Sequence, residues 1–160
     1  MAEETEVTKK WSDVWGVPLD EGEYTSFPNY FYDHYHKILL PRPDRGDVPQ
    51  PASPMKPVEF MFIHHLMRHE GESPSLKTIA QEMGMSIQMV REYKKAIEGA
   101  GLLKVTYRLH DTSTYDLEDF ILAMKALEEE AIEEARVAEE EKQREIDERT
   151  RAMMGKWEPD

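Results

Sequence analysis

Two amphipathic segments joined by a tight turn, within residues 76–95, constrain the fold of this chain most strongly. Apolar residues recur at helical spacing on both sides of the turn, which predicts two helices that pack together. Gly84 can adopt the left-handed backbone that ends a helix, and Ser86 can accept a hydrogen bond from the start of the next helix. Ala80 is small enough for the helices to cross closely. The pattern is typical of a helix-turn-helix, although an ordinary helical hairpin would use the same residues.

The residues that follow distinguish these two alternatives. The second predicted helix ends at Gly101, and residues 102–108 then alternate between apolar and polar side chains, as β-strands do. A polar turn and a short strand at residues 115–117 complete a predicted β-hairpin. Another amphipathic helix is predicted over residues 58–70. Three helices followed by a hairpin predict an α+β, mostly α fold, with a winged helix-turn-helix domain over residues 58–117.

Three segments precede this domain. Residues 1–26 are acidic and polar, which favours a flexible arm, although Trp11 and Trp15 could form one helical turn that docks on a groove. Residues 27–40 carry aromatic and apolar side chains at helical spacing and predict an entry helix. Residues 41–57 hold six of the ten prolines. We expect these residues to form a semi-rigid surface linker without a helix or a central strand.

Residues 118–160 are predicted to form one long acidic helix and a short tail. Phe120, Met124 and Leu127 recur at nearly heptad spacing, and the apolar seam then fades to alanine and charged residues. We expect these three residues to pair two copies of the chain as a homodimer over the first turns. The alternative is that they pack on the first core helix or the entry helix of their own chain. Repulsion between two glutamate triplets disfavours a longer parallel pair.

The charge of the chain is unusual for a protein that binds nucleic acid. Its formal net charge is −13, whereas such domains are usually basic. Residues 55–117 contain 8 Lys/Arg and 8 Asp/Glu, so the acidic excess lies on either side of the predicted domain.

The chain has no cysteine, which excludes disulfides and thiolate chemistry and fits a reducing cytoplasm. No apolar run approaches the length of about 18 residues that a membrane span needs.

Two histidine pairs raise the question of a metal site. His65 and His69 are one helical turn apart, a spacing that can bind zinc. No third ligand lies nearby in the sequence, and His34 and His36 cannot share a helix face, so we expect no metal site. The chain also lacks a glycine-rich phosphate loop and a metalloprotease signature. We therefore expect a protein that is not an enzyme and has no cofactor.

A resemblance to a known family rests on the stretch SPSLKTIAQEMGMSIQMVREYKKAIEGAGLLKVTYR and the TYDLEDF that follows it. This stretch resembles the winged-helix domain of plasmid and phage replication initiators and of DnaD-like primosomal proteins. The likeness covers residues 27–122, with residues 41–57 as an apparent insertion. Many bacterial transcription regulators share its core pattern, and the Tyr-Asp-Leu return at residues 115–117 favours the replication proteins.

The resemblance implies that a recognition helix at residues 86–100 enters the major groove of double-stranded DNA. Gln88 would reach adenine and Arg91 guanine. The residues implied to meet phosphate are Lys77, Ser86, Lys94, Lys95, Lys104 and Arg108. We expect DNA binding in replication initiation or transcription regulation, with other proteins of those processes as partners. The alternative is a non-catalytic winged-helix module that binds protein within a larger complex.

Overall fold

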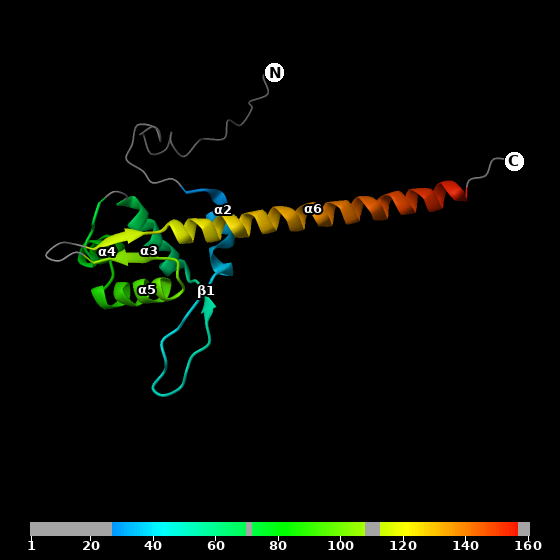
Figure 1. Cartoon of the computed structure of the whole chain (residues 1–160). Coiled ribbons are helices and arrows are strands. Elements are labelled where there is room, and N and C mark those ends of the chain that lie inside the picture. Colours follow the sequence, from blue (N-terminus) through cyan, green and yellow to red (C-terminus); the bar gives the residue numbers. More distant parts are fainter. Residues whose placement is uncertain (1–26, 70–71, 108–112, 157–160) are drawn as a thin grey trace, which may run out of the picture.

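The computed structural model describes residues 27–69, 72–107 and 113–156, which form five α-helices and two small antiparallel sheets (Figure 1). The elements in chain order are α2 (Asn29–His34), the 3-10 turn η1 (Tyr35–Lys37), β1 (Leu39–Leu40), β2 (Ser53–Pro54), α3 (Pro57–Arg68), α4 (Leu76–Met83), α5 (Ile87–Gly99), β3 (Lys104–Thr106), β4 (Thr114–Asp116) and α6 (Glu118–Gly155). Figure 1 shows α3, α4 and α5 gathered at one end, with α6 extending far beyond them. The expectation of an α+β, mostly helical fold is confirmed.

Helix α3 forms the centre of the core. It begins at Pro57, whose ring presets the helical backbone angle at a position where no N–H is needed. The Glu59 side chain accepts the backbone N–H of Lys56 at 2.8 Å and so caps the helix start. Phe62 and Ile63 are completely buried, so the inward face of α3 is covered by the helices that follow it.

A tight turn joins α4 to α5. The Ser75 hydroxyl accepts the Thr78 N–H at 3.1 Å and caps α4, and the Ser86 hydroxyl accepts the Met89 N–H at 3.2 Å and caps α5. Gly84 ends α4 with a φ of 65°, which glycine adopts without strain. The roles expected of Gly84 and Ser86 are therefore confirmed.

A two-stranded antiparallel sheet follows α5. Its paired residues are Lys104 with Asp116, Val105 with Tyr115 and Thr106 with Thr114. Leu102 and Leu103 are buried just before β3 and hold the sheet against the helices. Residues 108–112, which connect the strands and include Arg108, lie outside the described residues.

The first described helix is shorter than the entry helix expected over residues 27–40. Helix α2 ends at His34, and after the 3-10 turn Leu39 and Leu40 form the strand β1. Leu40 precedes Pro41, and the residue before a proline favours extended backbone, which suits the place of Leu40 in β1. The extended backbone places Leu40, which is completely buried, in the core.

The proline-rich residues 41–57 lie mostly at the surface and contain only an edge strand, as the sequence predicts, but contacts fix them to the rest of the domain. Ser53–Pro54 pair with β1, and Met55 is buried. The Arg42 guanidinium donates to both carboxylate oxygens of Glu59, at 2.7 and 2.9 Å, and to the Ser53 hydroxyl at 2.6 Å. These bonds fix the segment to the start of α3 as a hairpin loop. Both of its strands are edge strands, where proline is tolerated.

The start of α6 packs within its own chain and does not form the predicted dimer seam. Phe120 and Met124 are completely buried, and Leu127 is partly buried against the same core. The Phe120 ring lies 5.6 Å from the Phe31 ring of α2, between centroids. Helix α2 belongs to the same chain as α6, so its effective concentration at this face is higher than that of a second copy of the chain. Helix α2 therefore covers the face. The structure therefore shows the intramolecular alternative for Phe120 and Met124, with Leu127 at the edge of the same core.

The rest of α6 is an exposed arm. Every described side chain from residue 132 to 156 is exposed, and Figure 1 shows this part of the helix projecting away from the other helices. Ion pairs support it locally, including one of 2.6 Å between Arg136 and Glu140, one turn apart. Such pairs stabilise an isolated helix by only about 0.2–0.5 kcal/mol each, so their contribution to the arm is small.

The predicted segments at the two ends of the chain lie outside the described residues. These are the arm over residues 1–26, with its two tryptophans, and residues 157–160. Among the helices that the structure describes, none has the length and apolar character that crossing a bilayer requires.

Candidate nucleic-acid interface

The outward face of α5 carries three polar side chains in one line. Gln88, Arg91 and Lys95 follow each other at intervals of three and four residues, so they lie on one side of the helix. All three are exposed, whereas Val90 and Ile97 on the opposite side are completely buried. The buried residues fix the rotation of α5 on the core, and this rotation turns the polar line toward solvent.

The loop between β1 and β2 stands beside this line and forms an open groove with it. Residues 41–44 make one wall, residues 88–99 make the other, and the groove has a volume of about 660 Å³. A Cβ atom at Gly99 would lie only 3.1 Å from the Pro41 side chain, so the loop touches the end of α5 directly. Any large ligand that covers the polar line therefore also meets the loop.

The groove holds charges of both signs. Arg91 and Lys95 are opposed by Glu92 and Asp44. Arg42 also lines the groove, but its guanidinium is paired with the Glu59 carboxylate, which is only 1% exposed. The free charges nearly cancel, so a polyanion would be held here by the placement of individual cations and not by an overall positive field.

The other predicted phosphate-binding residues are dispersed over the surface. Lys77 is exposed on α4, and Ser86 uses its hydroxyl to cap α5. The Lys94 ammonium donates to the Tyr107 hydroxyl at 3.0 Å and lies 5.1 Å from the centre of that ring. Lys104 lies 3.4 Å from an aspartate of α6. Lys94 and Lys104 would therefore have to share these partners with a phosphate.

Sequence reasoning did not identify residues 41–44 as part of this surface. The prolines predict an extended segment but carry no signal of where that segment lies in space. Its position depends on the bonds of Arg42 to Glu59 and on the contact of Pro41 with Gly99. Both contacts join parts of the chain that are distant in sequence, which spacing within one segment cannot reveal.

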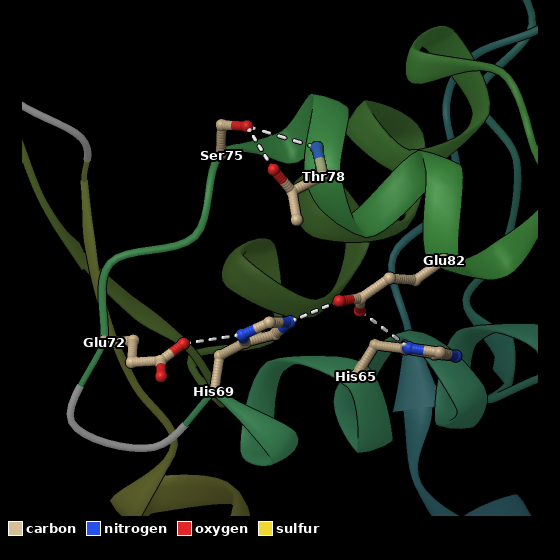
Figure 2. A network of polar contacts seen from close by, with 6 residues as sticks. All are labelled: His65, His69, Glu72, Ser75, Thr78 and Glu82. Atoms are coloured by element: carbon tan, nitrogen blue, oxygen red, sulfur yellow. Dashed lines mark hydrogen bonds and ion pairs between the residues drawn. The ribbon is translucent and has the colours of Figure 1, made fainter.

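A second polar cluster joins the end of α3 to α4 (Figure 2). His69 Nε2 lies 2.6 Å from Glu82 Oε1, and His69 Nδ1 lies 2.9 Å from Glu72 Oε2. His65 Nδ1 lies 3.1 Å from the other oxygen of Glu82. The Glu82 carboxylate at the end of α4 thus accepts hydrogen bonds from two successive turns of α3.

These contacts shift the pKa values of the cluster in opposite directions. The hydrogen bond to Glu72 raises the pKa of His69 above its ordinary value of 6.5, and although burial opposes this, the bond and the charge of Glu82 reinforce it. Burial raises the pKa of Glu82, but the hydrogen bonds from His69 and His65 outweigh burial and leave that pKa below its ordinary 4.5. The cluster therefore favours a charged His69 beside an ionised Glu82.

The cluster brings a carboxylate to the histidine pair, which sequence spacing did not reveal. Glu82 lies between His65 and His69, although no third ligand was expected near them. Among the described residues, however, no group of three or more ligating side chains is arranged to hold a metal ion. The carboxylate serves here as a hydrogen-bond acceptor for both rings.

His64 lies apart from this cluster, among aromatic rings. Its ring centre is 3.8 Å from that of Phe27 and 4.4 Å from that of Phe60. Burial lowers the pKa of His64, and the nearby His65 lowers it further. Its buried Nε2 has no hydrogen-bond partner among the described residues. His64 therefore packs as a neutral ring at pH 7.

Comparisons with known proteins add no constraint to this geometry. No protein-family model, no curated protein and no solved structure matches the chain. The resemblance to replication initiators and DnaD-like proteins therefore stays a prediction.

Proposed function

We propose that residues 58–117 are a winged helix-turn-helix domain that binds double-stranded DNA through α5. The order of three helices followed by an antiparallel hairpin supports the proposal, as does the tight turn between α4 and α5. The observation that carries it is the exposed line of Gln88, Arg91 and Lys95, because a helix with such a line can lie in the major groove.

In this arrangement the residues divide between bases and phosphates. Gln88 pairs with adenine and Arg91 with guanine, and each bidentate contact contributes about 1–3 kcal/mol of discrimination. Lys95 and Lys77 meet phosphates, since both are exposed on the helices that would face the duplex. The β3–β4 hairpin is the wing, and Arg108, which the resemblance assigns to phosphate, belongs to the residues outside the described structure.

We also propose a biological setting for this binding. The resemblance implies replication initiation or transcription regulation by a cytoplasmic protein without enzymatic activity, acting with other proteins of the same process. The neutral charge balance of residues 55–117 is compatible with such a role, because the acidic excess lies outside this segment.

Binding of the intact chain to mixed-sequence duplex DNA over a range of salt concentrations tests the proposal. The logarithm of affinity falls by about 0.9 per phosphate contact for each tenfold rise in salt. Replacing Lys77 and Lys95 together by alanine should therefore make the slope shallower by about 1.8 at most. The matched control replaces Lys142 and Arg151, two exposed residues of the distal arm, by alanine and should leave the slope unchanged. Absence of salt-dependent binding at low ionic strength would refute DNA binding.

A second experiment tests base recognition. Gln88→Ala and Arg91→Ala should each weaken binding to a duplex selected in vitro by about 1–3 kcal/mol, with smaller losses on random duplexes. Equal losses on both duplexes would assign these side chains to phosphate contact.

A non-catalytic protein-interaction module is the second candidate, and the groove beside α5 favours it. Pro41, Pro43 and Ala96 give the groove apolar walls, and its free charges nearly cancel. A photo-crosslinking residue in place of Glu92 would distinguish the two functions in cells. Adducts with nucleic acid support the first candidate, and adducts with protein alone support the second.

A further inference from the structure

His69 is the one described histidine that has carboxylates against both ring nitrogens (Figure 2). Nε2 lies 2.6 Å from Glu82, and Nδ1 lies 2.9 Å from Glu72. An ionised carboxylate only accepts hydrogen bonds, and a neutral imidazole has a single N–H. Both bonds can therefore exist together only when the ring is a charged imidazolium.

The two carboxylates differ in exposure and in the element that carries them. The Glu82 side chain is 19% exposed and belongs to α4, whereas the Glu72 side chain is 70% exposed and lies in the segment that leads into α4. A neutral ring keeps one N–H, and the shorter bond to the less exposed Glu82 is the one it retains. Glu72 then exchanges its bond for water.

Other charged and titratable groups surround His69 among the described residues. On α3 these are Arg68, whose charge acts on Glu82, and the neighbouring histidines 64 and 65. From β4 and α6, Asp116, Glu118 and Lys125 border the same hollow as His69. Together with Glu72 and Glu82, the carboxylates outnumber the permanent cations among these described residues, so the surroundings favour the charged ring.

We infer that His69 is a pH-dependent clamp, which holds the segment leading into α4 against α3 while the ring is charged and releases that segment when the ring is neutral. Helix α4 continues into α5 through the turn at Gly84. Release removes the bond to Glu72 and leaves the bond to Glu82 to hold α4, so the start of α4 and the exposed line on α5 are held less firmly and DNA affinity falls as the ring loses its proton. This last step rests on the proposed function, whereas the clamp itself does not.

The range of pH follows from the directions of the shifts. Because the pKa of His69 is raised in the folded state, His69 stabilises the folded chain fully below its pKa in the unfolded state, 6.5. This stabilisation is lost as the pH rises through the pKa of His69 in the folded state. The lowered pKa of Glu82 means that its contribution is present above 4.5 and is lost as pH falls through the folded value. The clamp is therefore closed in mildly acidic solution and opens on the alkaline side. His64, whose pKa is lowered, has the opposite effect on stability below its ordinary value.

Titration of the histidine ring signals of the intact chain by NMR tests the clamp without any substitution. We expect His69 to titrate above 6.5, while the amide signals of residues 72–75 shift with the same midpoint. Glu72→Gln should lower the His69 midpoint without unfolding the chain, because the Glu72 side chain is 70% exposed. His36→Gln, at an exposed position of η1, is the matched control and should leave the midpoint unchanged.

The results separate the clamp from the DNA-binding function. A His69 midpoint at or below 6.5, or one that Glu72→Gln does not lower, overturns the clamp. A raised midpoint with no duplex binding at any pH supports the clamp and refutes the proposed function. If the His69 midpoint is raised and the chain also binds duplex DNA, the DNA affinity of the wild type should fall several-fold between pH 6 and pH 9 at constant ionic strength. His69→Gln should remove most of this pH dependence. An unchanged pH dependence in His69→Gln would overturn the link between the clamp and binding.

Discussion

Replacing Arg42 by alanine should destabilise the chain far more than an ordinary surface substitution. The guanidinium donates four hydrogen bonds: two to the Glu59 carboxylate, one to the Ser53 hydroxyl and one to the Pro54 carbonyl. Glu59 is only 1% exposed, so the alanine variant retains a buried carboxylate without its counter-charge. Breaking a buried ion pair by removing one partner costs about 3–5 kcal/mol.

A second substitution tests whether the buried charge is the cause. Glu59→Gln in the Arg42→Ala background removes that charge, while the amide oxygen can still accept the Lys56 N–H that Glu59 accepts at 2.8 Å. We expect the double variant to recover about 1–3 kcal/mol, which is the penalty for a buried unsatisfied group. Arg45→Ala, at an exposed position of the same loop, is the matched control and should change stability by less than about 0.5 kcal/mol.

Urea and thermal unfolding measured by circular dichroism provide the comparison. Without the exposed arm, the folded part of the chain has about 100 residues, and for a domain of about 60–100 residues 1 kcal/mol corresponds to about 4–8 °C in Tm. Arg42→Ala should therefore lower Tm by at least about 12 °C. The reasoning is refuted if Arg42→Ala and Arg45→Ala unfold within about 0.5 kcal/mol of each other. It is also refuted if Glu59→Gln adds to the loss caused by Arg42→Ala.

Three further predictions concern the core, the turn and the arm. Phe120→Ala should cost about 3–5 kcal/mol in urea unfolding because its ring is completely buried, whereas Leu122→Ala, at a 52% exposed position, should cost less than about 0.5 kcal/mol. Gly84→Ala should cost about 1–2 kcal/mol through its φ of 65° alone, since nothing lies within 4 Å of the added Cβ; Gly155→Ala is the control in ordinary helical backbone, and an equal loss there would contradict this cause. Removing residues 135–160 should leave the main thermal transition unchanged while reducing the helical signal, and a lower Tm would contradict the exposed arm. The intact chain should sediment as a monomer, because Phe120 packs within its own chain, and a concentration-dependent mass would contradict this expectation.

The middle helices could be predicted from the sequence because their signals are local. Gly84 and Ser86 mark the turn by backbone geometry and by capping, and the apolar spacing on either side defines two inward faces. The strands at residues 104–106 and 114–116 follow from alternation and a polar turn. Each of these signals lies within a few residues of the structure that it predicts.

The other features could not be predicted because they depend on contacts between distant segments. Phe120 has the spacing of a dimer seam, and only the position of Phe31 on α2 makes it part of the intramolecular core. Arg42 lies in a proline-rich stretch that suggests a linker, and only its bonds to Glu59 give that stretch a fixed place. Glu82 was an ordinary helix residue in the sequence until the packing of α4 on α3 placed it between two histidines.

The packing of Phe120 also bears on how a chain with a net charge of −13 could bind DNA. Residues 128–141 contain 8 Asp/Glu and 1 Lys/Arg, so much of the acidic excess lies on the distal part of α6. Because the first turns of α6 are fixed on α2, the arm leaves the domain on a defined path, and Figure 1 shows that this path leads away from α5. Exposed charges separated by more than about 8 Å are largely screened at physiological ionic strength. The acidic arm would then oppose DNA mainly at low salt, and the local balance along α5 would decide binding in the cell.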